Sequence, residues 1–144
     1  MEKVLNILSH SPEETLGLAN KLVNLFTPQD VLILKGPLGS GKTVFVRGLA
    51  KALGLDENKV NSPSFTIVNE YPGDNSLYHF DLYRLADVDE LIEIGWDEYM
   101  NREGLMVVEW GEKAKEYLPN SFYELEFKII SETEREINIS FQKE

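Results

Sequence analysis

The sequence predicts an α/β fold: a mostly parallel central sheet with helices on both faces, in three α/β/α layers, and a C-terminal antiparallel hairpin. An almost continuous apolar run, VLILK at residues 31–35, is typical of a strand buried on both faces of a parallel sheet. A glycine-rich segment and an amphipathic helical pattern follow this run directly. Residues 122–130 and 135–141 alternate apolar and polar side chains, which predicts two paired antiparallel strands.

The chain has the length and composition of one domain. Its 144 residues are 42% hydrophobic, enough to form a core, and contain no repeat or linker. Because cysteine is absent, the sequence excludes a disulfide framework and a thiolate metal site. No leader pattern opens the chain, and no apolar run reaches the roughly 20 residues of a membrane span. We therefore expect a single domain over residues 1–144, located in the cytoplasm and without a membrane partner.

The N-terminal part predicts a strand followed by a helix. Residues 2–8 (EKVLNIL) have the apolar content of a strand. A helix start follows, with Ser11 as N-cap, Pro12 as the first helical residue and Glu14 reaching back in a capping box. Apolar side chains then recur at helical spacing, which predicts one packed face: Leu16, Ala19, Leu22, Val23 and Phe26. Residues 27–30 (TPQD) have turn chemistry and separate this helix from the apolar run.

The glycine-rich segment GPLGSGKT, residues 36–43, fits the phosphate-binding loop pattern G-x-x-x-x-G-K-[ST]. A buried strand precedes it. A helix from Lys42 to Leu53 follows and closes at Gly54. The order strand, loop, helix is the structural context that the pattern requires, so the sequence predicts a P-loop nucleotide-binding fold.

Further elements follow the loop helix. Apolar runs predict strands at residues 64–70 (SFTIVNE), 77–82 (LYHFDL) and 105–109 (LMVVE). Between the last two, Asp87 and Glu90 predict a capped helix start, and Gly95 is expected to break or bend that helix. Its predicted buried side consists of Leu91, Ile94 and Met100. Residues 131–134 (SETE) are the predicted turn of the C-terminal hairpin.

The loop residues explain phosphate binding physically. Backbone N–H groups can turn toward a phosphate only where bulky Cβ atoms are absent, and a helix N-terminus adds partial positive charge. Lys42 supplies a full charge near the β- and γ-phosphates, and the Thr43 hydroxyl is placed to hold Mg²⁺. The expected nucleotide contacts in this segment are Gly36, Leu38, Gly39, Ser40, Gly41, Lys42, Thr43 and Val44.

Mg²⁺ at such a site needs a carboxylate at the end of a strand beside the loop strand. Glu109 ends the run LMVVE, and Asp81 stands among apolar and aromatic residues in YHFDLYRL. Both are candidates for catalysis and metal binding. The alternative for each is an ordinary solvated acid.

Three other residues allow two interpretations. Thr66 is either a switch-type hydroxyl that senses the γ-phosphate or an ordinary strand threonine. Trp110 either lies over the nucleotide or belongs to the core, and a tryptophan here is more often core. For His79, a hydrogen-bonded structural role is favoured over a catalytic one.

The charge distribution limits the kinds of partner. The net charge is −11; residues 1–55 carry a net +2 and residues 56–144 a net −13. This field repels a polyanion, so we do not expect direct, tight nucleic-acid binding. A basic protein partner is the simpler interpretation, and solubility alone is the alternative.

Missing motifs narrow the enzyme class. No NKxD or D-x-x-G motif follows the loop, which disfavours a Ras-type GTPase. The chain has four arginines and no arginine-rich lid pattern, which disfavours a small-molecule kinase, and no arginine finger is evident. We therefore expect slow intrinsic hydrolysis.

Several motifs together resemble the TsaE family, also called YjeE. They are SPSFTIVNEY, YHFDLYRLAD with the following DELIEIGWDEY, and VVEWGEK, all behind GPLGSGKT, and the resemblance runs from about Ser11 to about Pro119. It implies a bacterial P-loop ATPase that uses ATP and Mg²⁺. It further implies a role in threonylcarbamoylation of the adenosine next to the anticodon in tRNAs that read codons starting with A. In that family the transfer itself belongs to TsaD, and the ATPase docks on the TsaD–TsaB pair.

The resemblance also implies residue roles. Lys42 and Thr43 match the loop lysine and the Mg²⁺ ligand, Glu109 the second metal-side acid, and Asp81 an essential acid near the metal. Thr66 falls in a switch-like segment. Ser11 and Thr15, near the first helix start, are expected to approach the base.

The chain departs from the family pattern at two loop positions. Pro37 stands where the family usually has Asp, and Val44 where it often has a second Thr. Neither change removes a phosphate contact. Two other functions stay open: a nucleotide-dependent binding module with incidental hydrolysis, and a small-molecule P-loop kinase.

Overall fold

The computed structural model describes residues 1–56 and 67–143. The strands are β1 (Glu2–Ser9), β2 (Val31–Lys35), β3 (Val68–Tyr71), β4 (Leu77–Asp81), β5 (Leu105–Glu109), β6 (Phe122–Ile129) and β7 (Arg135–Gln142). The α-helices are α1 (Pro12–Leu22), α2 (Lys42–Ala52), α3 (Asp89–Ile94) and α4 (Trp96–Met100), and the 3-10 helices include η1 (Val23–Leu25) and η3 (Gly111–Tyr117).

The described strands form one mixed sheet of seven strands in the order β1-β7-β6-β2-β5-β4-β3. Its centre is parallel, because β2 pairs in parallel with both β6 and β5, and β5 with β4. Both flanks are antiparallel: β7 pairs with β6 and β1 on one side, and β3 pairs with β4 on the other. The predicted α/β fold with a parallel core and a C-terminal hairpin is confirmed.

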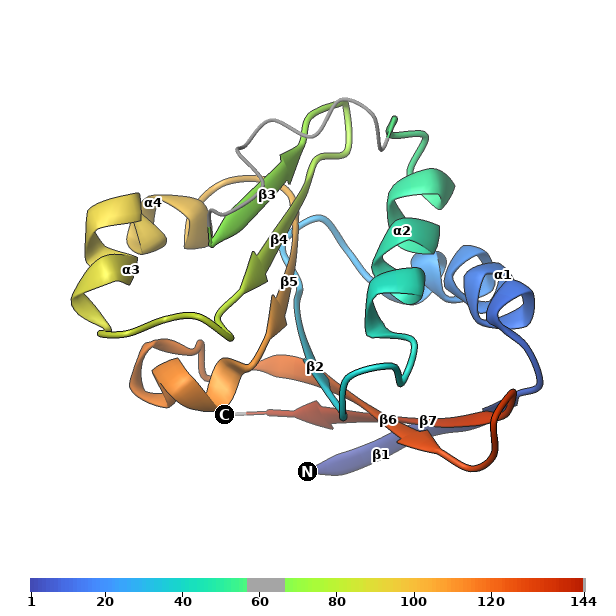
Figure 1. Ribbon diagram of the computed structural model, residues 1–144. Coiled ribbons are helices and arrows are strands. Elements are labelled where there is room, and N and C mark those ends of the chain that lie inside the picture. The colour runs from blue at the N-terminus through green and yellow to red at the C-terminus, as the bar shows by residue number, and fades with distance from the viewer. Residues whose placement is uncertain (57–66, 144) are drawn as a thin grey trace.

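Helices cover both faces of the sheet, with α1 and α2 on one side and α3 and α4 on the other (Figure 1). The side chains of β2 serve both layers. Leu32 and Leu34 pack in the cluster that contains α1 and α2, whereas Val31 and Ile33 pack in the cluster of α3 and α4. Alternation along a strand thus explains why VLILK is apolar at nearly every position.

The start of α1 follows the predicted pattern with one difference. Ser11 is the N-cap and its Oγ accepts a hydrogen bond from the Glu14 N–H at 3.0 Å, with Pro12 as the first helical residue. The Glu14 carboxylate, however, accepts from the His10 N–H at 3.1 Å instead of from the cap residue. The reciprocal bond of the predicted capping box is therefore displaced by one residue toward the N-terminus.

Helix α1 packs closely on α2 at Gly48. A Cβ built at this glycine would lie 2.7 Å from both the Ala19 Cβ and the Leu16 carbonyl oxygen. The missing side chain allows this approach. A Cβ built at Gly41, at the start of α2, would lie 3.6 Å from the Thr15 Cγ2, so the N-terminal ends of the two helices lie next to each other.

The remaining predicted elements fall close to the expected bounds. Residues 64–66 of the predicted strand 64–70 lie outside the described residues; β3 begins at Val68 and ends at Tyr71, one residue beyond the predicted end. The predicted helix after Asp87 is divided into α3 and α4 at Gly95, which has φ +84°. The N-cap of α3 is Val88, which has no side-chain cap, so the predicted cap at Asp87 is wrong by one residue; the Asp87 carboxylate still accepts from the Asp89 N–H at 3.0 Å. Among the described residues, no helix combines the length and apolarity that a membrane crossing requires.

The hairpin of β6 and β7 extends the sheet beside the loop strand. Phe127 of β6 is 1% exposed and meets the Phe45 ring of α2 edge-on, with centroids 5.5 Å apart. Because β6 runs parallel to β2, the turn after β6 lies at the same end of the sheet as the glycine-rich loop after β2. The hairpin is thereby part of the surroundings of the loop.

Candidate functional site

A pocket of about 290 Å³ lies where β4 and β5 end and α2 begins. Segments far apart in the sequence contribute to it: the start of α1, the glycine-rich loop, the ends of β4 and β5, and the hairpin turn. The lining residues are Pro12, Thr15, Leu38, Gly39, Gly41, Lys42, Thr43, Val44, Asp81, Tyr83, Glu109, Trp110, Glu132, Thr133 and Arg135.

The glycine-rich loop has the backbone shape of an anion cradle. Gly36 has φ +145°, and a Cβ there would lie 2.6 Å from the Phe127 carbonyl oxygen and 2.8 Å from the Ser40 Oγ. Gly41 has φ +100° and is the N-cap of α2, where no side chain caps the helix. The first turn of α2 therefore presents its N–H groups toward the pocket without a capping side chain to satisfy them.

Ser40 and Lys42 are polar groups buried in this loop. Ser40 is 0% exposed, and its Oγ has no hydrogen-bond partner among the described residues. Lys42 is 5% exposed, and its Nζ donates to the Gly36 carbonyl at 2.6 Å. The same Nζ lies 4.8 Å from the centroid of the Trp110 ring. Lys42 lines the pocket, so a buried cation beside an uncapped helix start suits a phosphate group, whereas Gly36 and Ser40 are not among the lining residues.

Glu109, at the end of β5, is buried between two partners. It is 5% exposed; its Oε2 lies 2.5 Å from the His79 Nε2 and its Oε1 lies 3.7 Å from the Lys42 Nζ. Burial is the largest single influence on the pKa of this carboxyl and raises it. The hydrogen bond and charge of His79, followed by those of Lys42, outweigh burial and hold the pKa below its ordinary value. Glu109 is therefore an anion at neutral pH despite its burial.

Asp81 stands beside Glu109 at the edge of the sheet. The parallel register of β4 and β5 places the two residues directly opposite each other. Unlike Glu109, Asp81 is exposed, and its Oδ1 accepts from the Tyr83 N–H at 3.1 Å. The two predicted carboxylates are thus neighbours in different environments.

The donor set fits Mg²⁺. The Thr43 hydroxyl and the carboxylates of Asp81 and Glu109 line one pocket, and oxygen ligands are those that Mg²⁺ prefers. Within residues 1–56 and 67–143, no group of three or more His, Asp or Glu residues forms a closed metal cage. Mg²⁺ typically keeps waters and uses one or two carboxylates plus substrate phosphates, so the open arrangement agrees with a metal that arrives with a nucleotide.

The other predicted site residues divide into three groups. Thr15 lines the pocket, and its buried Oγ1 lies 2.7 Å from the Ser9 Oγ. Trp110 also lines it, half-buried, with its ring 5.0 Å from the Tyr83 ring. Ser11 is not among the lining residues, because its hydroxyl caps α1. Thr66 lies outside the described residues.

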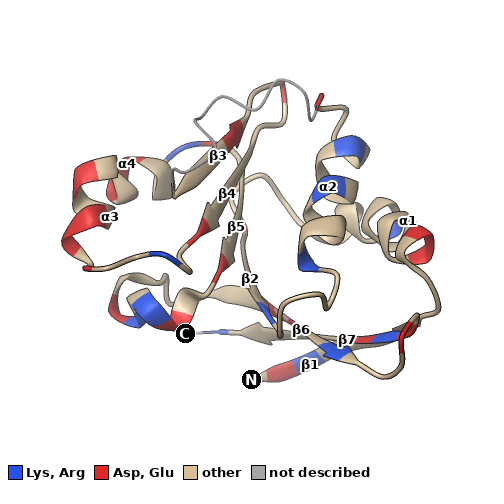
Figure 2. Cartoon of the chain, viewed as in Figure 1, with Lys and Arg blue, Asp and Glu red and all other residues tan. Residues whose placement is uncertain are grey.

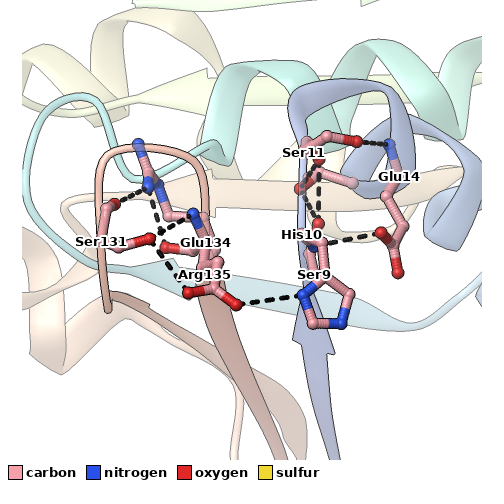
Figure 3. Close-up of polar contacts among 8 residues, drawn as sticks. Ser9, His10, Ser11, Glu14, Ser131, Glu134 and Arg135 are labelled. Atoms are coloured by element: carbon pink, nitrogen blue, oxygen red, sulfur yellow. Dashed lines mark hydrogen bonds and ion pairs between the residues drawn. The ribbon is translucent and has the colours of Figure 1, made fainter.

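The sequence did not identify the hairpin turn as part of the pocket. The Nη2 of Arg135 donates to the Gly39 carbonyl at 3.0 Å, and its Nη1 donates to the carbonyls of Ser131 and Glu134 at 2.7 and 2.9 Å. Figure 3 shows this turn facing the connection between β1 and α1, where the Glu134 carboxylate lies 3.1 Å from the His10 Nδ1. The sequence shows that Arg135 is present, but its position at the pocket follows only from the pairing of β6 with β2.

The sequence and the fold both have known relatives. A family model described as "Threonylcarbamoyl adenosine biosynthesis protein TsaE" matches residues 9–137. A Bacillus subtilis (strain 168) protein named "tRNA threonylcarbamoyladenosine biosynthesis protein TsaE" is 42% identical over 131 residues, covering 90% of this chain and 81% of the relative. The protein of the same name from Aquifex aeolicus is 40% identical over 141 residues, covering 96% and 98%.

A solved structure supports the same relationship. The crystal structure of Bacillus subtilis YdiB superimposes with a TM-score of 0.79 at 34% identity, covering 100% of this chain and 89% of YdiB. This chain therefore shares the fold of YdiB over the whole of its own length. Since the family model spans nearly the whole chain and the relatives match over most of their own lengths, this chain belongs to the TsaE family.

Proposed function

We propose that this chain is an ATP-binding and slowly hydrolysing subunit required for threonylcarbamoyladenosine modification of tRNA. In this proposal it acts by nucleotide-dependent docking on the TsaD–TsaB transferase pair. The observation that carries the proposal is the pocket that joins Lys42 and Thr43 of the loop to Asp81 and Glu109 at the strand ends. The names of the relatives give the pathway, and the pocket supports the nucleotide chemistry.

The residues of the pocket divide the work of holding ATP. The N–H groups at the start of α2 would bind the phosphates, and Lys42 would exchange the Gly36 carbonyl for β- and γ-phosphate oxygens. Thr43 and Glu109, with Asp81 nearby, would hold Mg²⁺, which when bound neutralises phosphate charge. Thr15 and Pro12 would approach the nucleoside, since they line the wall of the pocket that α1 contributes.

We expect slow ATP hydrolysis because the guanidinium of the arginine at the pocket is already hydrogen-bonded. Phosphoryl transfer needs positive charge that is free to stabilise the developing negative charge of the transition state. Arg135 is the arginine that lines the described pocket, and its guanidinium is bonded to the carbonyls of Gly39, Ser131 and Glu134. Because both terminal nitrogens of Arg135 already donate to these carbonyls, we expect a low basal rate of ATP hydrolysis that a partner protein raises.

Surface charge favours a protein partner over direct tRNA binding. Acidic residues cover α3 and α4, as Figure 2 shows, and residues 56–144 carry a net charge of −13. A negative field of this size repels tRNA and attracts a basic protein surface. The proposal therefore assigns the tRNA contacts to the partners.

A multiple-turnover modification assay tests the role of hydrolysis. Glu109→Gln and Asp81→Asn variants are first shown by calorimetry to bind ATP, and then supplied to the TsaD–TsaB pair with tRNA. We expect at most one round of modification per complex, with Glu116→Gln, an exposed carboxylate outside the pocket, behaving as wild type. Many rounds with a variant that binds ATP but does not cleave it would contradict the ATPase proposal and favour a binding module with incidental hydrolysis.

A further inference from the structure

We propose that His79 is a positioning residue for Glu109: it fixes which carboxylate oxygen faces the metal that arrives with the nucleotide. This inference rests on the proposed function, because it assigns Glu109 to Mg²⁺. The juxtaposition of the two side chains across β4 and β5 carries it.

The pairing follows from strand alternation and register. Leu77 of β4 and Val107 of β5 pack in the cluster of α1 and α2, so side chains two residues further along each strand point to that face as well. His79 and Glu109 are such residues. Because Asp81 stands opposite Glu109, His79 stands diagonally behind it, at a separation that long side chains bridge.

The hydrogen bond makes the two oxygens of Glu109 unequal. Oε2 is held by the His79 Nε2 at 2.5 Å, whereas Oε1 faces the Lys42 Nζ at 3.7 Å. When Lys42 turns to the phosphates, Oε1 is the oxygen left facing the pocket. The carboxylate cannot rotate without breaking its bond to His79, so it presents a single oxygen in a fixed direction. Orientation of a ligating carboxylate by a neighbouring hydrogen bond is a general property of metal sites.

Burial makes this arrangement difficult to replace. His79 is 7% exposed and Glu109 is 5% exposed, so water has little access to the bond between them. Without the ring N–H, the buried Oε2 loses its donor. An unsatisfied buried carboxylate oxygen costs free energy, so the carboxylate is expected to turn toward another donor. Lys42 is the cation within reach, and a carboxylate drawn to Lys42 is no longer directed at a metal.

The experiment separates metal positioning from structural support. ATP affinity is measured by calorimetry in Mg²⁺ and again in EDTA, for wild type, His79→Leu and His79→Gln. The leucine fills the ring volume without a donor, whereas the glutamine amide places an N–H near the position of Nε2. As a readout independent of hydrolysis, Mn²⁺ binding to the ATP complex is followed by electron paramagnetic resonance.

We expect the ratio of the two ATP affinities to fall by about 10- to 100-fold in His79→Leu, in line with the loss of other partners of metal ligands. The affinity in EDTA should fall by much less than the affinity in Mg²⁺, and His79→Gln should restore the ratio to within about threefold of wild type. His10→Gln, at the exposed histidine of the chain, is the matched control and should leave the ratio unchanged. If His79→Leu does not fold, His79→Asn, whose amide is too short to reach Glu109, takes its place with the same expectation.

Two results overturn the inference and differ in what else they overturn. If wild type prefers ATP with Mg²⁺ and the donor-free variant keeps the full preference, His79 is a structural residue and the proposed function stands. If wild type itself binds ATP equally with and without Mg²⁺, the metal role of Glu109 is wrong, and the role of His79 fails with it.

Discussion

The pocket has a buried half and an open half, and the two are built differently. In the buried half, Lys42, His79 and Glu109 are 5%, 7% and 5% exposed, and each bonds or pairs with another of the three. In the open half, Thr43 and Asp81 are exposed, and Arg135 is held by backbone carbonyls. Charges in the buried half depend on one another because water cannot replace a lost partner, whereas charges in the open half are screened.

The largest expected effect breaks the buried half at Lys42. Lys42→Ala removes the cation proposed for the phosphates and leaves Glu109 with His79 as the remaining one of its two partners. We expect ATP affinity to fall by at least about 100-fold, or about 2.7 kcal/mol, when measured by calorimetry. Lys51→Ala, at the exposed end of α2, is the matched control. Unchanged ATP affinity in Lys42→Ala would show that this loop is not the nucleotide site.

Two glycines of the same loop differ in how closely the chain packs around them, and the free energy of unfolding measures that difference. Gly36→Ala places a Cβ 2.6 Å from the Phe127 carbonyl at φ +145°, whereas Gly39→Ala, at φ +81°, meets nothing within 4 Å. We expect Gly36→Ala to lower the free energy of unfolding by roughly 2–4 kcal/mol, and Gly39→Ala by about 1 kcal/mol from backbone strain alone. Urea denaturation measures both values, and equal losses would mean that the close contact at Gly36 is unimportant.

A smaller effect is expected in the open half at Arg135. Arg135→Ala removes a guanidinium that joins the hairpin turn to the Gly39 carbonyl. Because the group is only half-buried, we expect ATP affinity to fall by about 3- to 10-fold, or about 1 kcal/mol. Arg102→Ala, whose guanidinium packs on the Tyr99 ring away from the pocket, should not change ATP affinity. A loss as large as that of Lys42→Ala would erase the distinction between the halves.

The smallest effect concerns Lys35, at the end of β2. Its hydrogen bond to Glu124, at 2.7 Å, raises the pKa of the Lys35 ammonium above its ordinary value. A raised pKa stabilises the fold below the unfolded-state pKa, and this contribution disappears as pH rises through the folded-state pKa. The side chain is 45% exposed, so we expect Lys35→Met to lower stability by only about 0.5 kcal/mol at pH 7. The difference should shrink as pH rises through the folded-state pKa of Lys35, which denaturation at pH 7 and at alkaline pH would detect.

Local patterns predicted the buried strand, the loop and the loop helix. Gly36, Lys42 and Thr43 are fixed by one continuous motif, so their placement needed no knowledge of distant contacts. Asp81 and Glu109 were also within reach, because each follows an apolar run at the end of a strand, and parallel neighbours end at the same edge of the sheet.

Contacts that depend on strand order could not be predicted from the sequence. The role of Arg135 at the pocket requires that β6 be the parallel neighbour of β2, and no local pattern encodes that choice. The bond between His79 and Glu109 likewise depends on the register of β4 with β5. For Ser11 the sequence allowed two roles, capping α1 and approaching the base, and in the structure its hydroxyl caps α1.

We expect nucleotide state to control docking on the TsaD–TsaB pair, and a binding measurement tests this most directly. The purified chain is titrated into the TsaD–TsaB pair with ATP and Mg²⁺, with EDTA and no nucleotide, and as Lys42→Ala with ATP and Mg²⁺. We expect binding at least about tenfold tighter, a difference of about 1.4 kcal/mol, in the first condition than in the other two. Equal affinity in all three conditions would contradict the account, because docking would then be independent of the pocket.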